Sequence, residues 1–333
     1  MQNSDKLQLL AYLPQIKSKK IAVLGDLMID QYTWGNVQRI SPEAPVPIVD
    51  VQSESTSLGG AANVAHNLQS LGATVFPIGI IGDDDAGVLL KHMVNDAGFR
   101  DDGIICEPNR PTTIKSRIIA HNQHVVRIDR ESRASIEKVS ENAIYAMLEN
   151  FIPELDALIF EDYNKGLLTQ KLIRDTIALA NKHSVLTTVD PKFSHFLEYQ
   201  HVTLFKPNRK ETEEATAQVI RSVDECITAA IKLRHKLNCQ NILITLGEEG
   251  MLLLDGNDNP THIPTRAQKV HDVSGAGDTV ISTLTAVLAT GASIVEAAHV
   301  ANFAASVVIA EIGAVPVDLL KLKQIIMQHD FSV

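Results

Sequence analysis

The sequence predicts an α/β fold, in which a mostly parallel, doubly wound sheet carries helices on both faces and a small β element forms a lid. Short apolar runs alternate with amphipathic stretches along the chain. Near-continuous apolar strands between helices are typical of a parallel sheet that is covered on both sides. Two segments break this alternation and have the pattern of paired β strands. The chain has 333 residues and 45% hydrophobic content, which is enough for a core of that size.

The predicted strands of the main sheet are short apolar runs, and most of them precede an amphipathic stretch. They are Ile21–Gly25, Val75–Gly82, Ala157–Phe160, Val185–Asp190, Val202–Phe205, Asn241–Leu246 and Met251–Leu254. The helical period is clear in Gln170–Lys182 and Val223–Leu237. Ligands of such sheets bind at the carboxyl ends of the strands, so we expect the functional site there.

The predicted lid consists of residues from about 33 to 57 and from 112 to 130. The second segment holds two runs, Ile114–Ala120 and Val125–Asp129, that have the pattern of one hairpin. We expect both segments to lie apart from the main sheet and to cover the ligand. Residues 1–333 show no internal repeat or low-complexity linker, so we expect a single domain.

Charge and cysteine content limit the possible partners. The chain has 30 Lys and Arg against 40 Asp and Glu, a net charge of −10, and no basic run. This argues against nucleic acid or an anionic membrane as the main partner. Cys106, Cys226 and Cys239 are few and lack a CxxC spacing, which favours a reducing cytoplasm. We see no secretory signal, and the uncharged run Thr279–Val295 fits a buried helix better than a membrane span.

The most informative segment is DVSGAGD, residues 272–278, at the start of that uncharged run. Gly275 and Gly277 allow the backbone to approach a ligand and to direct N–H groups at it, and the positive end of a helix dipole favours negative charge there. Asp278 is placed to accept a proton from a hydroxyl that attacks phosphorus. Taken alone, such a segment is more often a tight turn with an N-cap.

A second glycine-rich segment, LGGAAN at residues 58–63, leads into a helix that we expect to end near Leu71. Its small residues permit close approach of a polyol or a phosphate, and Asn63 offers both a donor and an acceptor to a sugar hydroxyl. The alternative is that these glycines only start a helix. Asp26 and Asp30 follow the first strand, where they either face a ligand or cap a helix.

Two absent motifs exclude other enzyme classes. The chain has no G-x-x-x-x-G-K-[ST] sequence, which argues against a P-loop kinase. No third glycine completes a dinucleotide fingerprint after Gly275 and Gly277, so a nicotinamide-dependent oxidoreductase loses support.

The two glycine-rich segments together resemble the signatures of the ribokinase-like (PfkB) carbohydrate kinases, in the expected order and over nearly the whole chain. Five further blocks resemble the branch of this family that acts on D-glycero-β-D-manno-heptose 7-phosphate in ADP-heptose synthesis for lipopolysaccharide. These blocks are GDLMID at 25–30, RISPEAPVP at 39–47, DYNKG at 162–166, DPK at 190–192 and KPNRKE at 206–211. Glu161 stands where the family more often has a small residue.

The resemblance implies a role for each matching position. Asp278 would be the catalytic base, and the amides of Gly275, Ala276 and Gly277 would form an anion hole for the transferring phosphoryl group. The implied sugar-binding positions are Asp30, Gly59, Gly60, Asn63 and Asp162.

The resemblance also implies ATP and Mg²⁺. Asn208 and Glu211 match a motif that organises Mg²⁺ through water, and oxygen ligands suit this ion. The implied nucleotide-binding positions are Asn208, Glu211, Thr245, Gly247, Gly250 and Asn302. Asp272 is a candidate ligand for a monovalent cation such as K⁺.

A phosphorylated sugar would need cations in a chain of net charge −10. Lys165 and Lys192 lie at predicted strand ends, where ligands bind, although a solvated role is the alternative for each. Arg117 and Arg127, on the predicted lid strands, are weaker candidates.

We therefore expect ATP-dependent conversion of heptose 7-phosphate to heptose 1,7-bisphosphate. Kinases of fructose, ribose or 2-keto-3-deoxygluconate are alternatives, as is a catalytically inactive sensor of sugar and nucleotide. We expect no nucleotidyltransferase domain, so the adenylyl-transfer step would need another protein. Exposed strand edges on the lid favour a homodimer formed through it.

Overall fold

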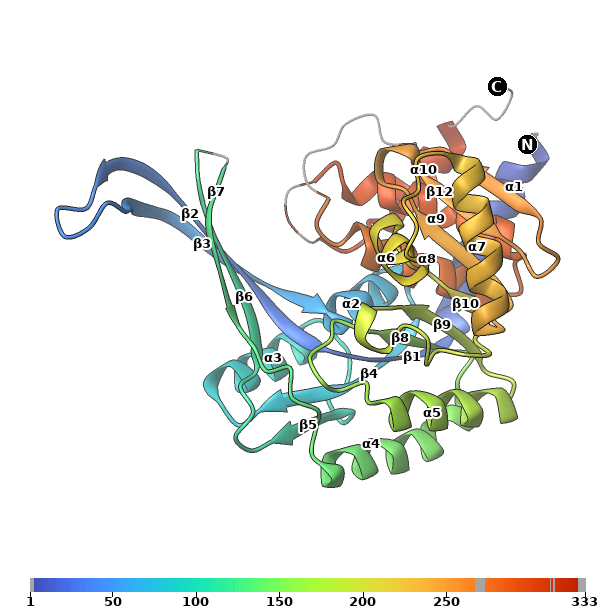
Figure 1. Ribbon diagram of the computed structural model, residues 1–333, viewed down its shortest axis with the longest axis horizontal. Helices are drawn as coiled ribbons and strands as arrows, with labels where there is room; N and C mark the ends of the chain where they lie inside the picture. Colours follow the sequence, from blue (N-terminus) through green and yellow to red (C-terminus); the bar gives the residue numbers. More distant parts are fainter. Residues whose placement is uncertain (1–2, 122, 267–272, 312, 314, 329–333) are drawn as a thin grey trace.

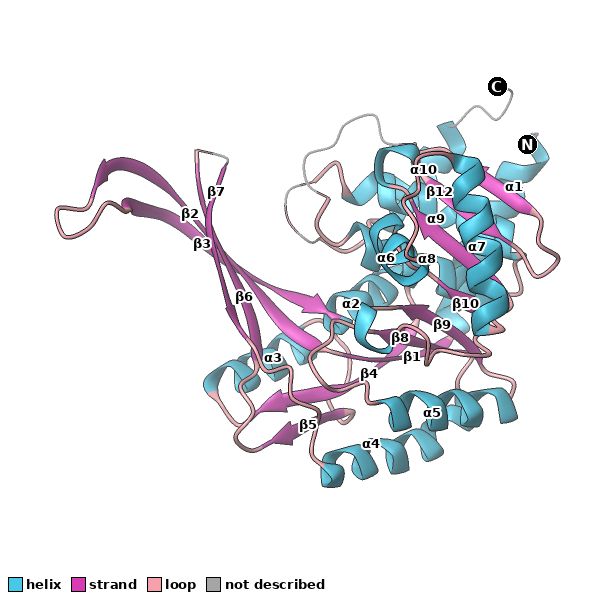
Figure 2. Ribbon diagram, viewed as in Figure 1, coloured by secondary structure: helices cyan, strands magenta, loops and turns pink. Residues whose placement is uncertain are grey.

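The computed structural model describes residues 3–121, 123–266, 273–311, 313 and 315–328, and a sheet of nine strands forms its centre (Figures 1 and 2). In sheet order the strands are β13 (Pro260–Ile263), β12 (Met251–Leu254), β11 (Asn241–Thr245), β10 (Leu204–Phe205), β9 (Leu186–Asp190), β8 (Ala157–Glu161), β1 (Lys20–Gly25), β4 (Thr74–Gly82) and β5 (Ile104–Glu107). All neighbours from β11 to β5 pair in parallel, whereas β12 and β13 are antiparallel additions at one edge. The predicted mostly parallel sheet is confirmed.

Helices cover both faces of this sheet, as predicted. They are α1 (Asn3–Tyr12), α2 (Ala61–Leu71), α3 (Asp85–Asp96), α4 (Lys138–Phe151), α5 (Gln170–Lys182), α6 (Arg209–Thr216), α7 (Val223–Leu237), α8 (Ala276–Ala289), α9 (Ile294–Val308) and α10 (Leu319–Gln328). Each face of the sheet carries its own hydrophobic core. Alternate residues of β1 belong to different cores, because successive side chains of a strand point to opposite faces. Ile21 and Val23 belong to the core that α2, α8 and α9 help to form, and Ala22 and Leu24 belong to the one under α4, α5 and α7.

The uncharged run is part of the core. α8 carries most of it, and the residues from Asp278 to Val287 are all buried. Among the described helices, none combines the length and the apolar character that crossing a membrane would require. Burial inside the core on one face of the sheet explains the absence of charge in this helix.

A second sheet of four strands extends away from the main body, and we call it the arm (Figure 1). Its order is β3 (Pro47–Gly60), β2 (Leu27–Ile40), β6 (Thr113–Ala120) and β7 (Gln123–Arg130). β6 and β7 pair in antiparallel fashion, which is the hairpin that the sequence predicts at residues 114–129.

The arm is larger than the small β element that the sequence predicts. β2 and β3 have 14 residues each and begin or end at the main body, at Leu27 and Gly60. The inner part of β2, from Leu27 to Asp30, is buried, so its residues look like a continuation of the core in the sequence. The outer parts of both strands are largely exposed, and only those parts have the polar composition that marks the arm.

Candidate active site

The candidate active site lies where five neighbouring strands of the main sheet end. Thr245 ends β11, Lys206 follows β10, Asp190 ends β9, Glu161 ends β8, and Asp26 follows β1. This is the carboxyl edge of the parallel strands, where the fold class places its ligands.

The two glycine-rich segments of the sequence meet at Asp278. Gly275 has a φ of 76°, a left-handed conformation that favours glycine, and α8 begins at the next residue, Ala276. Asp278 therefore lies in the first turn of this helix. Its Oδ2 accepts a hydrogen bond from Asn63 Nδ2 at 2.7 Å, and its Oδ1 accepts one from the Tyr163 hydroxyl at 3.0 Å. The structure thus brings Asn63 to the carboxylate of Asp278, as the pairing of the two segments suggests.

The environment of Asp278 strengthens its carboxylate as a base. Burial raises the pKa of Asp278 to about 6, and the charge of Asp190 acts in the same direction, while the hydrogen bonds from Asn63 and Tyr163 oppose the shift. A carboxylate with a pKa of about 6 is still mostly ionised at neutral pH, yet it accepts a proton more readily than an ordinary aspartate.

Gly277 faces a buried ion pair. Lys206 Nζ lies 2.7 Å from Asp190 Oδ2, and both side chains are almost completely buried. A methyl group on Gly277 would lie 3.6 Å from each of these two atoms, which is an ordinary contact. The fold therefore tolerates a side chain at Gly277, but that side chain would occupy space next to Lys206.

Glu161 is the third carboxylate at this place. A carboxylate directly after a strand is often a solvated loop residue, but Glu161 is only 1% exposed. Burial raises its pKa well above the ordinary value, and the charges of Asp190 and Asp278 add to the effect.

Asp30 and the glycines of β3 lie together at the inner end of the arm. Asp30, on β2, forms an ion pair with Arg117 on β6. A Cβ atom on Gly59 would lie 2.5 Å from Asp30 Oδ2, and one on Gly60 would lie 2.4 Å from the backbone oxygen of Asp26. A side chain at either position would collide with these atoms, so Gly59 serves the close packing of β3 against β2 and Gly60 that of β3 against the segment after β1.

Lys165 lies at the joint between the body and the arm. Its loop is held by Asp26, whose Oδ2 accepts hydrogen bonds from the backbone N–H groups of Tyr163 and Lys165 at 2.9 and 3.0 Å. Lys165 Nζ lies 2.8 Å from Glu131 Oε2, and Lys115 Nζ lies 3.2 Å from the same oxygen. Burial alone would raise the pKa of Glu131, but hydrogen bonds from the two lysines outweigh it and lower the pKa to about 2.

Two other predicted site residues, Arg127 and Asp162, have partners outside the cluster of Lys165, Lys115 and Glu131. Arg127, on β7, is exposed and pairs with Asp129 on the same strand. The Asp162 carboxylate accepts hydrogen bonds from the Asn164 backbone N–H at 2.7 Å and from the Tyr199 hydroxyl at 2.8 Å. Asp162 therefore stabilises its own loop and fastens it to Tyr199.

The predicted metal-organising pair begins α6. Asn208 Oδ1 accepts a hydrogen bond from the Glu211 backbone N–H at 2.8 Å, and Glu211 Oε2 accepts one from the Asn208 backbone N–H at 2.9 Å. This is a capping box. The other oxygen of Glu211 lies 2.6 Å from Lys192 Nζ, so Lys192 pairs with the start of α6, whereas Lys165 pairs with Glu131.

A cavity of about 420 Å³ adjoins the glycine turn. Four of the predicted nucleotide positions line it together with the turn, namely Thr245, Gly247, Gly250 and Asn302 with Ala276 and Gly277. Its remaining wall is mostly apolar, with Met251, Val273, Val280, Ala305 and Ile309. Asn302 Nδ2 donates a hydrogen bond to the backbone oxygen of Pro264 at 2.8 Å, so it fixes the rim of the cavity. Asp272 lies outside the described residues.

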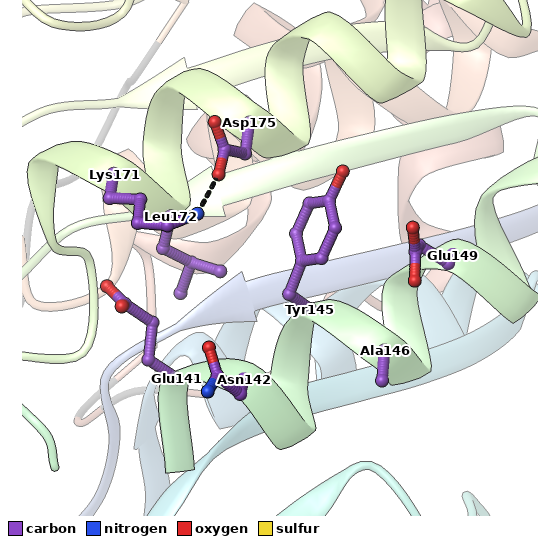
Figure 3. Close-up of a pocket in the computed structure, with 8 residues that line it drawn as sticks. All are labelled: Glu141, Asn142, Tyr145, Ala146, Glu149, Lys171, Leu172 and Asp175. Atoms are coloured by element: carbon purple, nitrogen blue, oxygen red, sulfur yellow. Dashed lines mark hydrogen bonds and ion pairs between the residues drawn. The ribbon is translucent and has the colours of Figure 1, made fainter. Parts of the chain in front are cut away.

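A second cavity, of about 220 Å³, lies between α4 and α5 (Figure 3). Lys171 pairs with Asp175 there and also lies over the ring of Tyr145. None of the predicted site residues lines this cavity. The predicted residues instead gather around the turn before α8 and the base of the arm.

Sequence reasoning missed several residues of the site, namely Tyr163, Asp190, Lys206, Lys115 and Glu131. Tyr163, Asp190 and Lys206 lie inside blocks that carry the family resemblance, and each lies at a strand end or within two residues of one, which was the available signal. Lys115 had no such signal, because its approach to Glu131 depends on the pairing of β6 with β7 and on the path of the chain after β7.

A buried carboxylate at a helix start with a cavity beside it fits a phosphotransferase that acts on a small hydroxyl-bearing substrate. The comparisons agree: the model of the "pfkB family carbohydrate kinase" matches residues 18–319. The chain belongs to this family of sugar kinases.

Among curated relatives, the bifunctional protein HldE of Helicobacter hepaticus is 44% identical over 299 residues, and that of Desulfatibacillum aliphaticivorans is 42% identical over 306 residues. These alignments cover 90% and 92% of the chain, which spans only 62% and 63% of the two relatives.

Solved structures share the fold at low sequence identity. Phosphofructokinase-2 from Escherichia coli in complex with potassium has a TM-score of 0.76 at 18% identity, over 92% of this chain and 98% of that one. Arabidopsis thaliana ribokinase complexed with ribose and ATP has a TM-score of 0.73 at 19% identity, over the same shares.

Proposed function

We propose that the chain transfers the γ-phosphoryl group of ATP to the anomeric hydroxyl of D-glycero-D-manno-heptose 7-phosphate, giving heptose 1,7-bisphosphate for ADP-heptose synthesis. The observation that carries this proposal is the buried carboxylate of Asp278, at the first turn of α8 and hydrogen-bonded to Asn63, in a chain that resembles the HldE proteins over most of its length.

Each part of the transfer has a group in this chain to perform it. Asp278 accepts the proton of the attacking hydroxyl, and its raised pKa makes it a better acceptor. Asn63 and Tyr163 orient the carboxylate through hydrogen bonds to its two oxygens. The backbone N–H groups of the turn at Gly275–Gly277 and the dipole of α8 stabilise negative charge on the phosphoryl group.

The donor and the sugar occupy opposite sides of Asp278 in this proposal. The cavity beside Gly277 takes ATP, because its apolar wall suits a flat base and it ends at the glycine turn. Asp30, Gly59, Gly60 and Asn63 lie on the side of the arm and take the sugar. The base of the arm covers the sugar as a lid and excludes water during transfer.

In this proposal, Lys165 binds the phosphate of the substrate. Lys165 and Lys115 converge on one carboxylate oxygen of Glu131, so two ammonium groups lie within reach of one anionic position. A substrate phosphate at this joint replaces Glu131 as the partner of both lysines. Lys192 pairs with Glu211 and serves the nucleotide side instead.

Mg²⁺ is the expected companion of ATP, and it supplies positive charge that offsets the phosphates. Asn208 and Glu211 offer oxygen atoms for it through water, although both are engaged in the capping box of α6. Asp272 stays a candidate ligand for K⁺.

The use of ATP and the three free cysteines favour a reducing compartment. We place the enzyme in the cytoplasm, where ATP is available and where Cys106, Cys226 and Cys239, which are free in the structure, stay reduced. We also propose a homodimer through the arm.

The alternatives are a kinase of 2-keto-3-deoxygluconate, fructose or ribose, and an inactive sensor. A panel of these sugars with heptose 7-phosphate, assayed for ADP release and for the product by ³¹P NMR, separates them. We expect a new anomeric phosphate signal only with heptose 7-phosphate. Faster phosphorylation of another sugar would reassign the substrate, and no ADP release with any sugar would support the sensor.

A further inference from the structure

Arg110 lies in the turn between β5 and β6, and its side chain is almost completely buried. Its Nε donates a hydrogen bond to Glu107 Oε2, its Nη1 donates one to the backbone oxygen of Lys165 at 3.0 Å, and its Nη2 donates one to that of Ala134 at 2.7 Å. The planar guanidinium presents its donors in fixed directions, so it can hold several groups in one arrangement. One side chain thus joins three segments that are far apart in the sequence.

Each of these three segments carries one member of the cluster of Lys165, Lys115 and Glu131. Lys165 is bonded to Arg110 directly, through its backbone oxygen. The turn that contains Arg110 leads into β6, which carries Lys115. Ala134 lies in the segment that follows Glu131. A displacement of Arg110 would therefore change the distances between the two ammonium groups and the carboxylate that meet there.

The backbone of Lys165 is fixed on both sides. Its N–H donates to Asp26 Oδ2 at 3.0 Å, and its carbonyl oxygen accepts from Arg110. Gly166 follows with a φ of 89°, and a Cβ atom there would lie 1.9 Å from the backbone oxygen of Ala134. The two segments that Arg110 bridges are therefore in direct contact, and the ammonium group of Lys165 extends from a fixed backbone.

Glu107 holds Arg110 and is itself held. It ends β5 and is buried, and its Oε1 accepts hydrogen bonds from the Glu137 backbone N–H at 2.6 Å and from the Ser140 hydroxyl at 3.3 Å. The cost of burying charge offsets much of the attraction in such an ion pair. The more specific contribution of the pair is therefore the geometry that it imposes on its partners.

We propose that Arg110 is a positioning residue, which holds Lys165, Lys115 and Glu131 in the arrangement that receives the phosphate of the substrate. Its Nε, Nη1 and Nη2 all have protein partners, so it acts through the backbone of Lys165 and not on the phosphate itself. The use of the cluster for a phosphate rests on the proposed function, whereas the arrangement of the cluster does not.

The first experiment needs no substrate and compares the loss of Tm that Glu131→Gln causes in the wild type and in Arg110→Lys at pH 7. Lysine keeps a positive charge beside Glu107, but its single nitrogen cannot bond Glu107 and both backbone oxygens in the same directions. We expect the loss in the Arg110→Lys background to shrink to about half or less, because Glu131 then no longer meets both lysines. A residue that supported only its own turn would give equal losses in both backgrounds.

The second experiment measures kcat and KM for heptose 7-phosphate and for free heptose, with ATP. Arg110→Lys should raise the KM for the phosphorylated sugar by about tenfold, with kcat and the constants for free heptose unchanged within about twofold. Arg234→Lys is the matched control, because Arg234 also pairs with a carboxylate, that of Asp258, and donates to a backbone oxygen, that of Gly256. It should leave the results of both experiments unchanged.

Equal losses of Tm in the two backgrounds would overturn the role of Arg110. So would an unchanged KM for heptose 7-phosphate in Arg110→Lys when the wild type prefers that sugar, or equal effects of Arg234→Lys. If Arg110→Lys does not fold by circular dichroism, Glu107→Gln, which weakens the hold on Arg110 Nε, replaces it under the same criteria. A wild type without preference for the phosphorylated sugar would contradict the proposed function, and the Tm experiment would still decide the role of Arg110.

Discussion

Asp278 combines burial, a helix N-terminus and a hydrogen bond to each of its carboxylate oxygens. The hydrogen bonds fix its orientation, while burial keeps its pKa at about 6. A carboxylate that served only as an N-cap would not need Asn63 and Tyr163 from two other segments of the chain.

We expect Asp278→Asn to lower turnover by about 10²–10⁴-fold, because the amide keeps the shape but cannot accept the proton. ATP binding should persist, since the cavity and the turn are unchanged. Steady-state kinetics and calorimetric titration with ATP measure the two effects. Turnover close to that of the wild type would show that Asp278 is not the base.

Gly277 and Gly275 allow a matched comparison within one turn. Gly277→Ala should fold with nearly the same Tm, because the new methyl group makes only ordinary contacts with Asp190 and Lys206, yet turnover should fall as the methyl group crowds the phosphoryl group. Gly275→Ala should lower the Tm, because its φ of 76° strains any side chain. Turnover close to that of the wild type in Gly277→Ala would show that the anion hole does not depend on this position.

Some residues of this site could be predicted from the sequence and others could not. Asn63 and Asp278 each lie in a glycine-rich segment with its own signal, so their meeting could be expected. Glu161 carried no such signal, since a carboxylate after a strand is equally typical of a solvated loop, and only the strand register shows that it faces Asp190.

At the scale of elements, one carboxylate links two lysines at the joint between the arm and the body. Glu131 follows β7 and holds Lys115 of β6 and Lys165 of the loop after β8. No local pattern predicts this joint, because its three members come from distant parts of the chain. The outer strands of the arm were predictable from local alternation, whereas the buried inner part of β2 resembled the core.

We expect Glu131→Gln to lower the Tm at pH 7 and to lose this effect in acid. The pKa of Glu131 lies at about 2 in the folded chain, below its ordinary value of 4.5, so its ionised form stabilises the fold above pH 4.5. That stabilisation decreases as the pH falls from 4.5 toward 2. Thermal melts of both proteins from pH 7 to pH 3 test this, and a constant difference in Tm would contradict it.

At the scale of the whole molecule, the arm exposes apolar side chains far from the main core. Ile40 is 60% exposed, Val51 54% and Ile128 55%, all on arm strands. A second copy of the chain would cover this face and the strand edges.

Light scattering across micromolar concentrations should therefore give the mass of a dimer. A charge in the interface should dissociate it, so Ile128→Asp should shift the mass toward the monomer, while Val139→Asp, on the exposed face of α4, should not. A wild-type monomer at every concentration would contradict the dimer.

The ratio of kcat/KM for heptose 7-phosphate to that for free heptose, measured with ATP in the wild type and in Lys165→Ala, tests the proposed function most directly. We predict a large preference for the phosphorylated sugar in the wild type, because Lys165 and Lys115 hold its phosphate. In Lys165→Ala the preference should shrink, chiefly through a higher KM. Equal kcat/KM for the two sugars in the wild type would contradict the assignment of heptose 7-phosphate as the substrate.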